Sequence, residues 1–209
     1  MTSAGFMLII SSPSGAGKTT LARKLTSVDK NLILSISVTT RPLRPSEVDG
    51  KDYFFKTKDE FEKMVSDDEL LEHAEVFGNF YGTPRKFVER NLKEGKGVVF
   101  DIDWQGAKIL KKHNKRIVSI FILPPSKEEL LSRLKNRAED SIEAQSKRMK
   151  MFETDVLHWK EYDYIVTNDN VDSTLETIIA IVKSERNNKA YPKEDNDRIE
   201  KRVIELISS

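Results

Sequence analysis

The sequence of 209 residues contains no cysteine, which excludes disulfide bonds, cysteine-ligated metals and thiol nucleophiles. It also lacks a long hydrophobic run, because the apolar start at 6–10 is far shorter than the ~20 residues that span a membrane. This start leads into a glycine-rich loop instead of a signal-peptide cleavage site. Neither sign of charge prevails, since 35 basic and 34 acidic residues leave a net charge of +1. We therefore expect a cytoplasmic protein with no nucleic-acid or membrane partner.

Short apolar runs alternate with segments of helical periodicity along most of the chain. Buried strands are predicted at 6–11, 32–38, 98–102, 117–123 and 164–166. Helices are predicted at 18–27, 104–113, 126–136, 141–158 and 172–186. Because this alternation is typical of βαβ units, the sequence predicts an α/β fold with a central parallel sheet.

Two segments depart from this alternation. The first, at about 37–90, is rich in short strands and turns, which indicates an inserted lobe. Its predicted elements are strands at 51–56, 70–77 and 79–82, a turn at Gly78-Asn79 and a helix at 84–93. The second segment follows a linker at 187–193 and contains a charged helix at about 195–207. This helix can pack on the core, pair with a second subunit or remain loose, and the sequence does not indicate an oligomeric state.

The stretch SSPSGAGKTT, at 11–20, follows the first predicted strand and precedes the first predicted helix. That is the context of a P-loop, in which backbone N–H groups bind phosphate, Lys18 contacts the β- and γ-phosphates and Thr19 binds Mg²⁺. The pattern GxxxxGK[ST] has glycine where this chain has Ser12. Because Pro13 favours extended geometry in the residue before it, we expect Ser12 to avoid a positive φ and the loop to be intact. The alternative is a glycine-rich helix cap that binds no nucleotide.

Three further stretches follow the P-loop in order along the chain. They are SISVTTRPLRP at 35–45 with GKDY at 50–53, EHAEVFGNFYGT at 72–83, and DIDWQG at 101–106. Together with the P-loop they closely resemble guanylate kinases, the enzymes that phosphorylate GMP from ATP, over about residues 6–185. The resemblance implies a three-layer P-loop NTPase fold with a central parallel sheet, an inserted GMP-binding lobe of short strands and a helical lid. It also implies transfer of the γ-phosphoryl group of ATP to GMP or dGMP, giving ADP and GDP for guanine nucleotide metabolism, with Mg²⁺ as cofactor.

The P-loop and the resemblance together assign the site residues. Those implied for ATP are Ser12, Pro13, Ser14, Gly15, Ala16, Gly17, Lys18, Thr19, Thr20 and Asn168. Those implied for GMP are Ser37, Arg41, Arg44, Tyr53, Glu72, Tyr81, Thr83 and Asp103. Those implied for catalysis are Lys18, Arg41, Arg133, Arg137 and Arg148, and those for Mg²⁺ are Thr19 and Asp101. The single domain at 1–209 would comprise a core at about 1–36, 97–124 and 160–186, a GMP-binding lobe at about 37–96, a lid at about 125–159 and a C-terminal linker and helix at 187–209.

The residue types suit these roles on chemical grounds. The planar guanidinium groups of Arg41 and Arg44 can grip a phosphate with paired hydrogen bonds, although two arginines without this context are more often ordinary surface residues. The carboxylate of Glu72 offers only acceptors, which complement the N1–H and 2-amino groups of guanine. Adenine presents an acceptor at N1 and lacks the 2-amino group, so this pocket would leave buried groups unpaired. Taken alone, Glu72 would be an ordinary surface glutamate.

The acid and the lid arginines also have alternatives. Asp101 ends a buried strand, where P-loop enzymes hold the magnesium-associated acid, but an aspartate there can instead cap the helix at 104–113. Arg133 and Arg137 share one predicted helix face and resemble lid arginines that stabilise the transferring phosphoryl group. The alternative for them is a solvated basic face. Ala138 stands where the family has glycine, which affects the geometry of the lid more than its charge.

Two other functions fit parts of this pattern. Guanylate-kinase-like domains of membrane scaffold proteins keep the fold and bind peptides, but they typically lose phosphate-loop residues, which are present here at 15–19. A P-loop kinase that accepts AMP or a ribose phosphate is the second alternative, and the acceptor pair Glu72 and Asp103 argues against AMP. We therefore expect an ATP-dependent GMP kinase.

Overall fold

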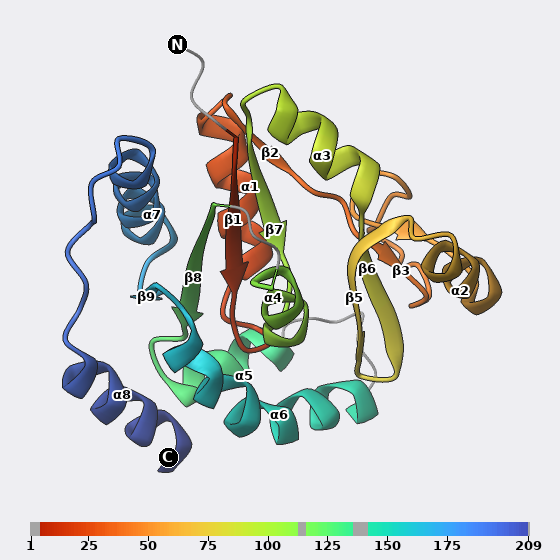
Figure 1. Cartoon of the computed structure of the whole chain (residues 1–209). Helices are drawn as coiled ribbons and strands as arrows, with labels where there is room; N and C mark the ends of the chain where they lie inside the picture. The colour runs from red at the N-terminus through yellow and green to blue at the C-terminus, as the bar shows by residue number, and fades with distance from the viewer. Residues whose placement is uncertain (1–4, 113–115, 136–141, 209) are drawn as a thin grey trace.

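The computed structural model describes residues 5–112, 116–135 and 142–208 (Figure 1). Its strands are β1 (Phe6–Ser11), β2 (Leu32–Leu34), β3 (Val38–Thr39), β4 (Phe54–Phe55), β5 (Leu70–Val76), β6 (Asn79–Pro84), β7 (Gly97–Asp101), β8 (Ile117–Leu123) and β9 (Tyr164–Thr167). Its helices are α1 (Lys18–Val28), α2 (Lys58–Ser66), α3 (Arg85–Lys93), α4 (Trp104–Leu110), α5 (Lys127–Lys135), α6 (Ile142–Leu157), the short 3₁₀ helix η1 (His158–Glu161), α7 (Val171–Arg186) and α8 (Asn196–Ser208).

The central sheet has five strands in the order β2-β7-β1-β8-β9, and all neighbouring pairs are parallel. The apolar runs that predicted buried strands form its middle, with β1 between β7 and β8. The expected α/β fold with a central parallel sheet is therefore confirmed.

Alternate residues of β1 enter two different apolar clusters, one on each face of the sheet. Leu8 and Ile10 pack with buried side chains of α1, α5, α6 and α7. Met7 and Ile9 pack with buried side chains of α3 and α4. The strand is buried on both faces, as expected for a parallel sheet covered by helices, and the molecule has three layers (Figure 1). Helix α3 lies within the range predicted for the inserted lobe, yet its Val88 packs on the core sheet.

A second sheet has the order β4-β3-β6-β5 and lies to one side of the first (Figure 1). The single strand predicted at 32–38 was wrong, because the chain leaves the central sheet after Leu34 and joins the second sheet at Val38. The strand predicted at 51–56 is limited to Phe54–Phe55, since the preceding residues form a turn in which Gly50 has φ 74°.

A hairpin joins β5 to β6, as the sequence predicts. Val76 pairs with Asn79, so the two turn residues are Phe77 and Gly78 rather than Gly78 and Asn79. Both have positive φ, 55° and 81°, which is the geometry of the tight turns that match the twist of paired strands. The hairpin carries Glu72 and Tyr81 towards the core.

The C-terminal helix α8 packs on the core. Its residues Ile199, Val203 and Leu206 are buried and join the apolar cluster on the α1 side of the sheet. Lys160 of η1 forms an ion pair with Glu200 at 2.6 Å. Of the three arrangements that the sequence allows, packing on the core is therefore the one observed.

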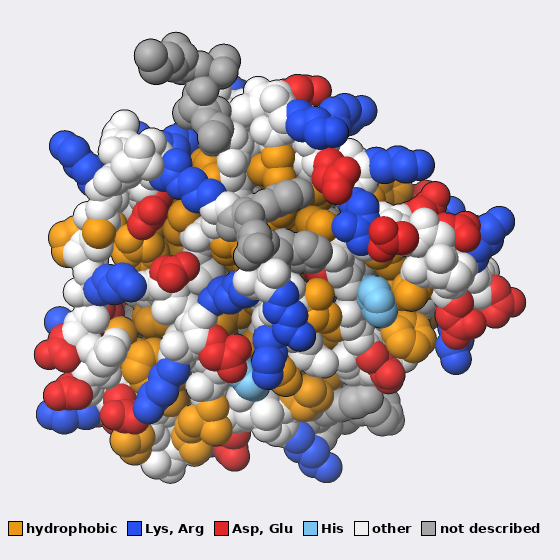
Figure 2. Space-filling model, in the orientation of Figure 1, with side chains coloured by type: hydrophobic (Ala, Val, Ile, Leu, Met, Phe, Trp, Pro, Cys, Tyr) orange, Lys and Arg blue, Asp and Glu red, His pale blue; other side chains and the backbone are white. Residues whose placement is uncertain are grey.

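The surface carries charges of both signs. Figure 2 shows basic and acidic side chains interspersed over the face that it presents. Among the described residues, no helix combines the length and hydrophobicity that crossing a membrane requires.

Candidate active site

A cavity of about 360 Å³ lies between the carboxyl ends of the central strands, the second sheet and the helices α5 and α6. Most of the described residues that were predicted for the site line it. They are Ser12, Pro13, Ser14, Gly15, Gly17, Lys18, Thr19, Thr20, Ser37, Arg41, Arg44, Tyr53, Glu72, Tyr81, Asp101, Asp103 and Arg133. Ala16, Thr83 and Asn168 are buried and are not among the lining residues. Arg137 and the side chain of Arg148 fall outside the described parts of the structure.

The loop between β1 and α1 has the backbone of an anion cradle. Gly15 and Gly17 have φ of 94° and 96°, a region that residues with a side chain rarely adopt. Ser12 is not among the described non-glycine residues with positive φ, so the glycine of the usual pattern is not needed there. The helix α1 begins directly after Gly17, and its N-terminus adds N–H donors and a favourable dipole. The loop therefore retains the geometry for binding phosphate.

Asn168 supports this loop from behind. Its side chain is fully buried, and its amide nitrogen donates to the carbonyl oxygen of Ala16 at 2.8 Å. A Cβ atom on Gly17 would lie 2.5 Å from the same nitrogen, so the packing here requires glycine. Asn168 is among the residues predicted for ATP, and its observed contact joins the loop at 11–17 to the end of β9.

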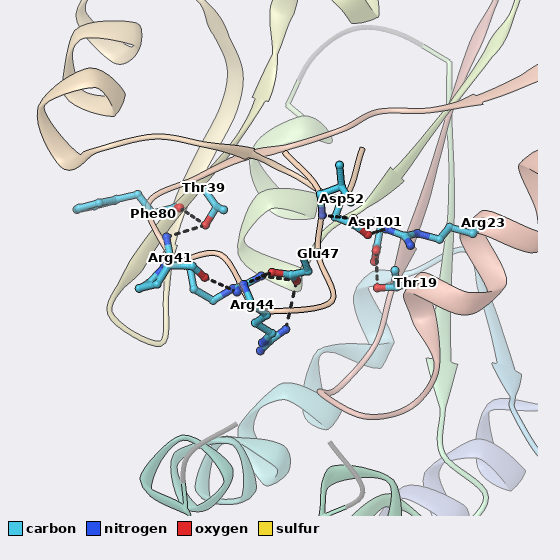
Figure 3. A network of polar contacts seen from close by, with 11 residues as sticks. Thr19, Arg23, Thr39, Arg41, Arg44, Glu47, Asp52, Phe80 and Asp101 are labelled. Atoms are coloured by element: carbon cyan, nitrogen blue, oxygen red, sulfur yellow. Dashed lines mark hydrogen bonds and ion pairs between the residues drawn. The ribbon is translucent and has the colours of Figure 1, made fainter. Parts of the chain in front are cut away.

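Three polar groups meet at the start of α1. The Nζ atom of Lys18 lies 2.6 Å from Oδ1 of Asp101. The hydroxyl of Thr19 donates to Oδ2 of Asp101 at 2.6 Å (Figure 3). Asp101 ends β7, beside the end of β1, because the two strands pair in parallel. The alternative that Asp101 caps α4 is wrong, since the capping side chain is Asp103, which accepts from the backbone N–H of Gly106 at 3.0 Å.

Glu72 is a buried acid that lines the cavity. Its side chain comes from β5 and is only 4% exposed, and the hydroxyl of Thr83 on β6 donates to Oε1 at 2.7 Å. Burial raises the pKa of the Glu72 carboxyl to about 7, with the Thr83 hydrogen bond lowering it and the nearby charge of Asp103 raising it. Glu72 is thus no surface residue, and its position suits an acceptor for a buried ligand group.

Gly106 makes room for this carboxylate, a role that the sequence analysis missed. A Cβ atom at Gly106 would lie 2.7 Å from Oε2 of Glu72 and 3.5 Å from Ile102. The helix α4 therefore approaches Glu72 closely only because residue 106 has no side chain. The glycine in the quoted stretch DIDWQG was a signal for such an approach.

Arg41 and Arg44 lie together on the loop after β3. Glu47, which the sequence analysis did not single out, contacts both guanidinium groups (Figure 3). The guanidinium of Arg41 also lies 5.4 Å from the ring centre of Tyr53, and the rings of Tyr53 and Tyr81 meet edge to face at 5.9 Å. Burial raises the pKa of the Tyr53 hydroxyl above its ordinary value, so it remains a neutral donor. Two cations and two phenols thus converge on one part of the cavity.

Helices α5 and α6 contribute one predicted arginine and one unexpected acid to the cavity. Arg133 of α5 lines the cavity and bonds to Glu129 on the same helix at 2.9 Å. Asp155 of α6 is buried and accepts from the indole N–H of Trp104 at 3.1 Å. Burial raises the pKa of Asp155 to about 6, the Trp104 hydrogen bond lowers it and Asp103 raises it. Nothing local in the sequence marks Asp155, since its partner is 51 residues away.

Comparisons with known proteins match this arrangement. The sequence model of the family described as guanylate kinase matches residues 5–185. The chain is 54% identical to the guanylate kinase of Rhizobium etli over 183 residues, covering 87% of this chain and 83% of that protein. It is 52% identical to the guanylate kinase of Rickettsia bellii over 182 residues, covering 87% and 95%. The crystal structure of guanylate kinase from Anaplasma phagocytophilum is similar with a TM-score of 0.74 at 40% identity, covering 88% of this chain and 87% of that one. The chain therefore belongs to the guanylate kinase family.

Proposed function

We propose that ATP binds on the loop at 11–20 and GMP on the second sheet when the protein phosphorylates GMP from ATP. The single observation that carries the proposal is the composition of the cavity. A phosphate-binding loop, a pair of arginines and a buried carboxylate share one space of about 360 Å³. A cavity of that size and chemistry can hold the phosphates of two nucleotides together with one base.

The ATP end of the site rests on the loop and α1. Backbone N–H groups near Gly15 and Gly17 bind the phosphates, and Lys18 carries positive charge to the β- and γ-phosphates. The ion pair between Lys18 and Asp101 at 2.6 Å keeps the lysine at the cavity when no nucleotide is bound. Arg133 adds a second cation from the lid.

Thr19 and Asp101 are the residues that would hold Mg²⁺. Their oxygens are hard ligands of the kind that Mg²⁺ prefers, and the hydroxyl and the carboxylate already lie within 2.6 Å of each other. Mg²⁺ in kinases usually takes only one or two protein ligands and completes its coordination with substrate phosphates and water, so this pair fits. When bound, the ion would neutralise charge on the ATP phosphates.

The GMP end of the site uses the second sheet and the start of α4. Arg41 and Arg44 bind the GMP phosphate, with Ser37 and the hydroxyls of Tyr53 and Tyr81 as further donors. Glu72 accepts hydrogen bonds from N1–H and the 2-amino group of guanine. Thr83 holds Glu72 in place, and Asp103 lies on the same wall of the cavity.

The reaction follows from this arrangement. An oxygen of the GMP phosphate forms a bond to the γ-phosphorus while the bond from that phosphorus to the bridging oxygen of ATP breaks, which gives GDP and ADP. The acceptor oxygen is already ionised near neutral pH, so no residue needs to act as a strong base. Lys18, Arg41, Arg44 and Arg133, with Arg137 and Arg148 from the lid, would stabilise the charge as it moves.

Water must be kept from the γ-phosphate, and closure of mobile parts is the usual means. We assign the core to about 1–36, 97–124 and 160–186, the GMP-binding lobe to about 37–96 and the lid to about 125–159. An ion pair at 2.5 Å between Arg23 of α1 and Asp52 of the second-sheet region supports direct contact of lobe and core (Figure 3). Guanine nucleotide metabolism in the cytoplasm is the setting that we propose.

A comparison of phosphate acceptors tests the proposal. Initial rates are measured with ATP and Mg²⁺ and with GMP, dGMP, IMP or AMP as acceptor, by coupling ADP release to NADH oxidation. We expect GMP to have the highest kcat/KM of the four and AMP to be a poor acceptor, because AMP leaves Glu72 without its donors. Turnover of AMP equal to or above that of GMP would reject the guanine pocket, and no turnover with any acceptor would favour a peptide-binding role.

A further inference from the structure

Glu47 lies between the two arginines of the proposed phosphate site. Its Oε1 and Oε2 atoms accept from Nη2 of Arg41 at 2.7 and 3.0 Å (Figure 3). Its Oε2 also accepts from the backbone N–H of Arg44 at 3.0 Å, and Nη1 of Arg44 lies 3.5 Å from Oε1. One carboxylate thus contacts both arginine side chains and the backbone that connects them.

The contacts of Glu47 close a short loop. Its own backbone N–H donates to the carbonyl of Arg44 at 3.0 Å, and Nη1 of Arg41 donates to the carbonyl of Pro42 at 2.7 Å. The side chains of Arg41, Arg44 and Glu47 are 12%, 18% and 12% exposed, so the ion pairs are largely removed from solvent. Charge-assisted hydrogen bonds of this kind are stronger than those on an open surface.

The contacts of Glu47 leave the arginines able to bind a ligand. Arg41 and Arg44 line the cavity, whereas Glu47 is not among its lining residues. Both oxygens of Glu47 contact the same nitrogen of Arg41, Nη2. Because a guanidinium group has five N–H donors, donors of Arg41 remain for a phosphate in the cavity.

The electrostatics of the loop explain why a carboxylate is needed. Two guanidinium groups held close together repel each other and lose hydration, and an anion between them offsets both effects. Burial raises the pKa of the Glu47 carboxyl, but hydrogen bonds from Arg41 and Arg44 outweigh it and the net pKa is lowered. The carboxylate is therefore ionised at neutral pH and keeps the arginines in place before a ligand arrives.

We propose that Glu47 is a positioning residue for the acceptor phosphate, which holds Arg41 and Arg44 in the geometry that binds it. This inference rests on the proposed function, because it takes the arginines as the phosphate site of GMP. Holding the two cations in advance reduces the ordering that binding would otherwise require. Loss of Glu47 should then weaken recognition of the phosphate and leave recognition of the guanine unchanged.

Calorimetric titration of GMP and of guanosine separates these two parts of the ligand. We expect Glu47→Gln and Glu47→Ala to weaken GMP binding about 10-fold or more and to leave guanosine binding within about twofold of the wild type. The matched control is Glu62→Ala, because Glu62 lies in the same lobe, its side chain is 60% exposed and it pairs only loosely with Lys58 at 3.7 Å. The control should bind both ligands like the wild type.

Steady-state kinetics give a second readout. In both Glu47 variants the KM for GMP should rise about 10-fold while the KM for ATP stays unchanged, a split that general loss of folding would not produce. GMP binding by Glu47→Gln equal to or tighter than the wild type would overturn the proposal and indicate a competing carboxylate. Equal losses for GMP and guanosine would overturn it in favour of a structural role. If the wild type itself binds GMP no more tightly than guanosine, the phosphate site of the proposed function fails instead.

Discussion

Replacing Glu72 by glutamine should stabilise the fold above neutral pH and at the same time remove recognition of guanine. Glu72 is 4% exposed, and its one described hydrogen bond comes from the hydroxyl of Thr83. Glutamine has the same shape and keeps an oxygen that can accept from Thr83, but it carries no charge. The substitution therefore removes the cost of burying an ionised carboxylate while it preserves the packing.

The size of the effect follows from the pKa of Glu72. A rise from 4.5 to about 7, at 1.36 kcal/mol per unit, corresponds to at most about 3 kcal/mol. Between these two values the folded protein holds a proton that the unfolded chain has released, so the stability of the wild type falls as pH rises through this window. Above about 7 the full cost of the buried charge is present, and below 4.5 it vanishes.

Urea unfolding followed by circular dichroism measures the difference at a series of pH values. The free energy of unfolding of Glu72→Gln relative to the wild type should increase between pH 5 and pH 8, by up to about 3 kcal/mol. The control Glu62→Gln changes an exposed side chain and should show no such trend. A difference between Glu72→Gln and the wild type that is constant across this range would show that folding does not raise the pKa of Glu72.

The activity of Glu72→Gln towards GMP should fall although its stability rises. Glutamine can accept at only one of its two polar atoms, so kcat/KM for GMP should fall at least about 100-fold in Glu72→Gln. In the wild type, kcat/KM for GMP should rise as pH increases through about 7, because the ionised form of Glu72 is the acceptor that guanine requires. A variant that is more stable but less active is expected where function requires a buried charge.

Three further experiments test other parts of the structure. Lys18→Ala should lower kcat at least about 100-fold with little change in Tm, and near-normal turnover would contradict the phosphate-loop assignment. Gly106→Ala places a Cβ atom 2.7 Å from Oε2 of Glu72, so it should raise the KM for GMP and cost about 1–3 kcal/mol in urea unfolding; unchanged values would show that α4 can shift. A double-mutant cycle of Arg23→Ala and Asp52→Ala should give a coupling energy below about 1 kcal/mol that decreases with added salt, because the Arg23 side chain is 44% exposed.

Much of the fold can be read from local patterns in the sequence. The apolar runs that form β1, β7 and β8 are predictable because a strand buried on both faces needs continuous hydrophobic residues. The division of 32–38 between two sheets was missed, since hydrophobic periodicity does not reveal where a chain changes its pairing partners. The hairpin turn was shifted by one residue because Phe77 adopts a positive φ, which is uncommon for a residue with a bulky side chain.

Site residues are predictable from the sequence where they belong to a local motif. They are not predictable where their role depends on a contact with a residue far away in the sequence. The order of residue types at 11–20 is sufficient to predict a phosphate-binding loop. The roles of Glu47 and Asp155 could not be predicted in this way, because their partners Arg41 and Trp104 are identified only in the folded structure. The role of Gly106 is predictable in part. A glycine near the start of a helix indicates that another group packs closely against it, but the sequence does not identify this group as Glu72.

The two nucleotides should occupy opposite ends of one cavity. A crystal structure of the protein with GMP and a non-hydrolysable ATP analogue would locate both. We expect the triphosphate on the loop at 11–20, the GMP phosphate on Arg41 and Arg44, and N1 and the 2-amino group of guanine within hydrogen-bond distance of Glu72. A GMP phosphate bound to the loop at 11–20, or a guanine base away from Glu72, would show that this arrangement is wrong.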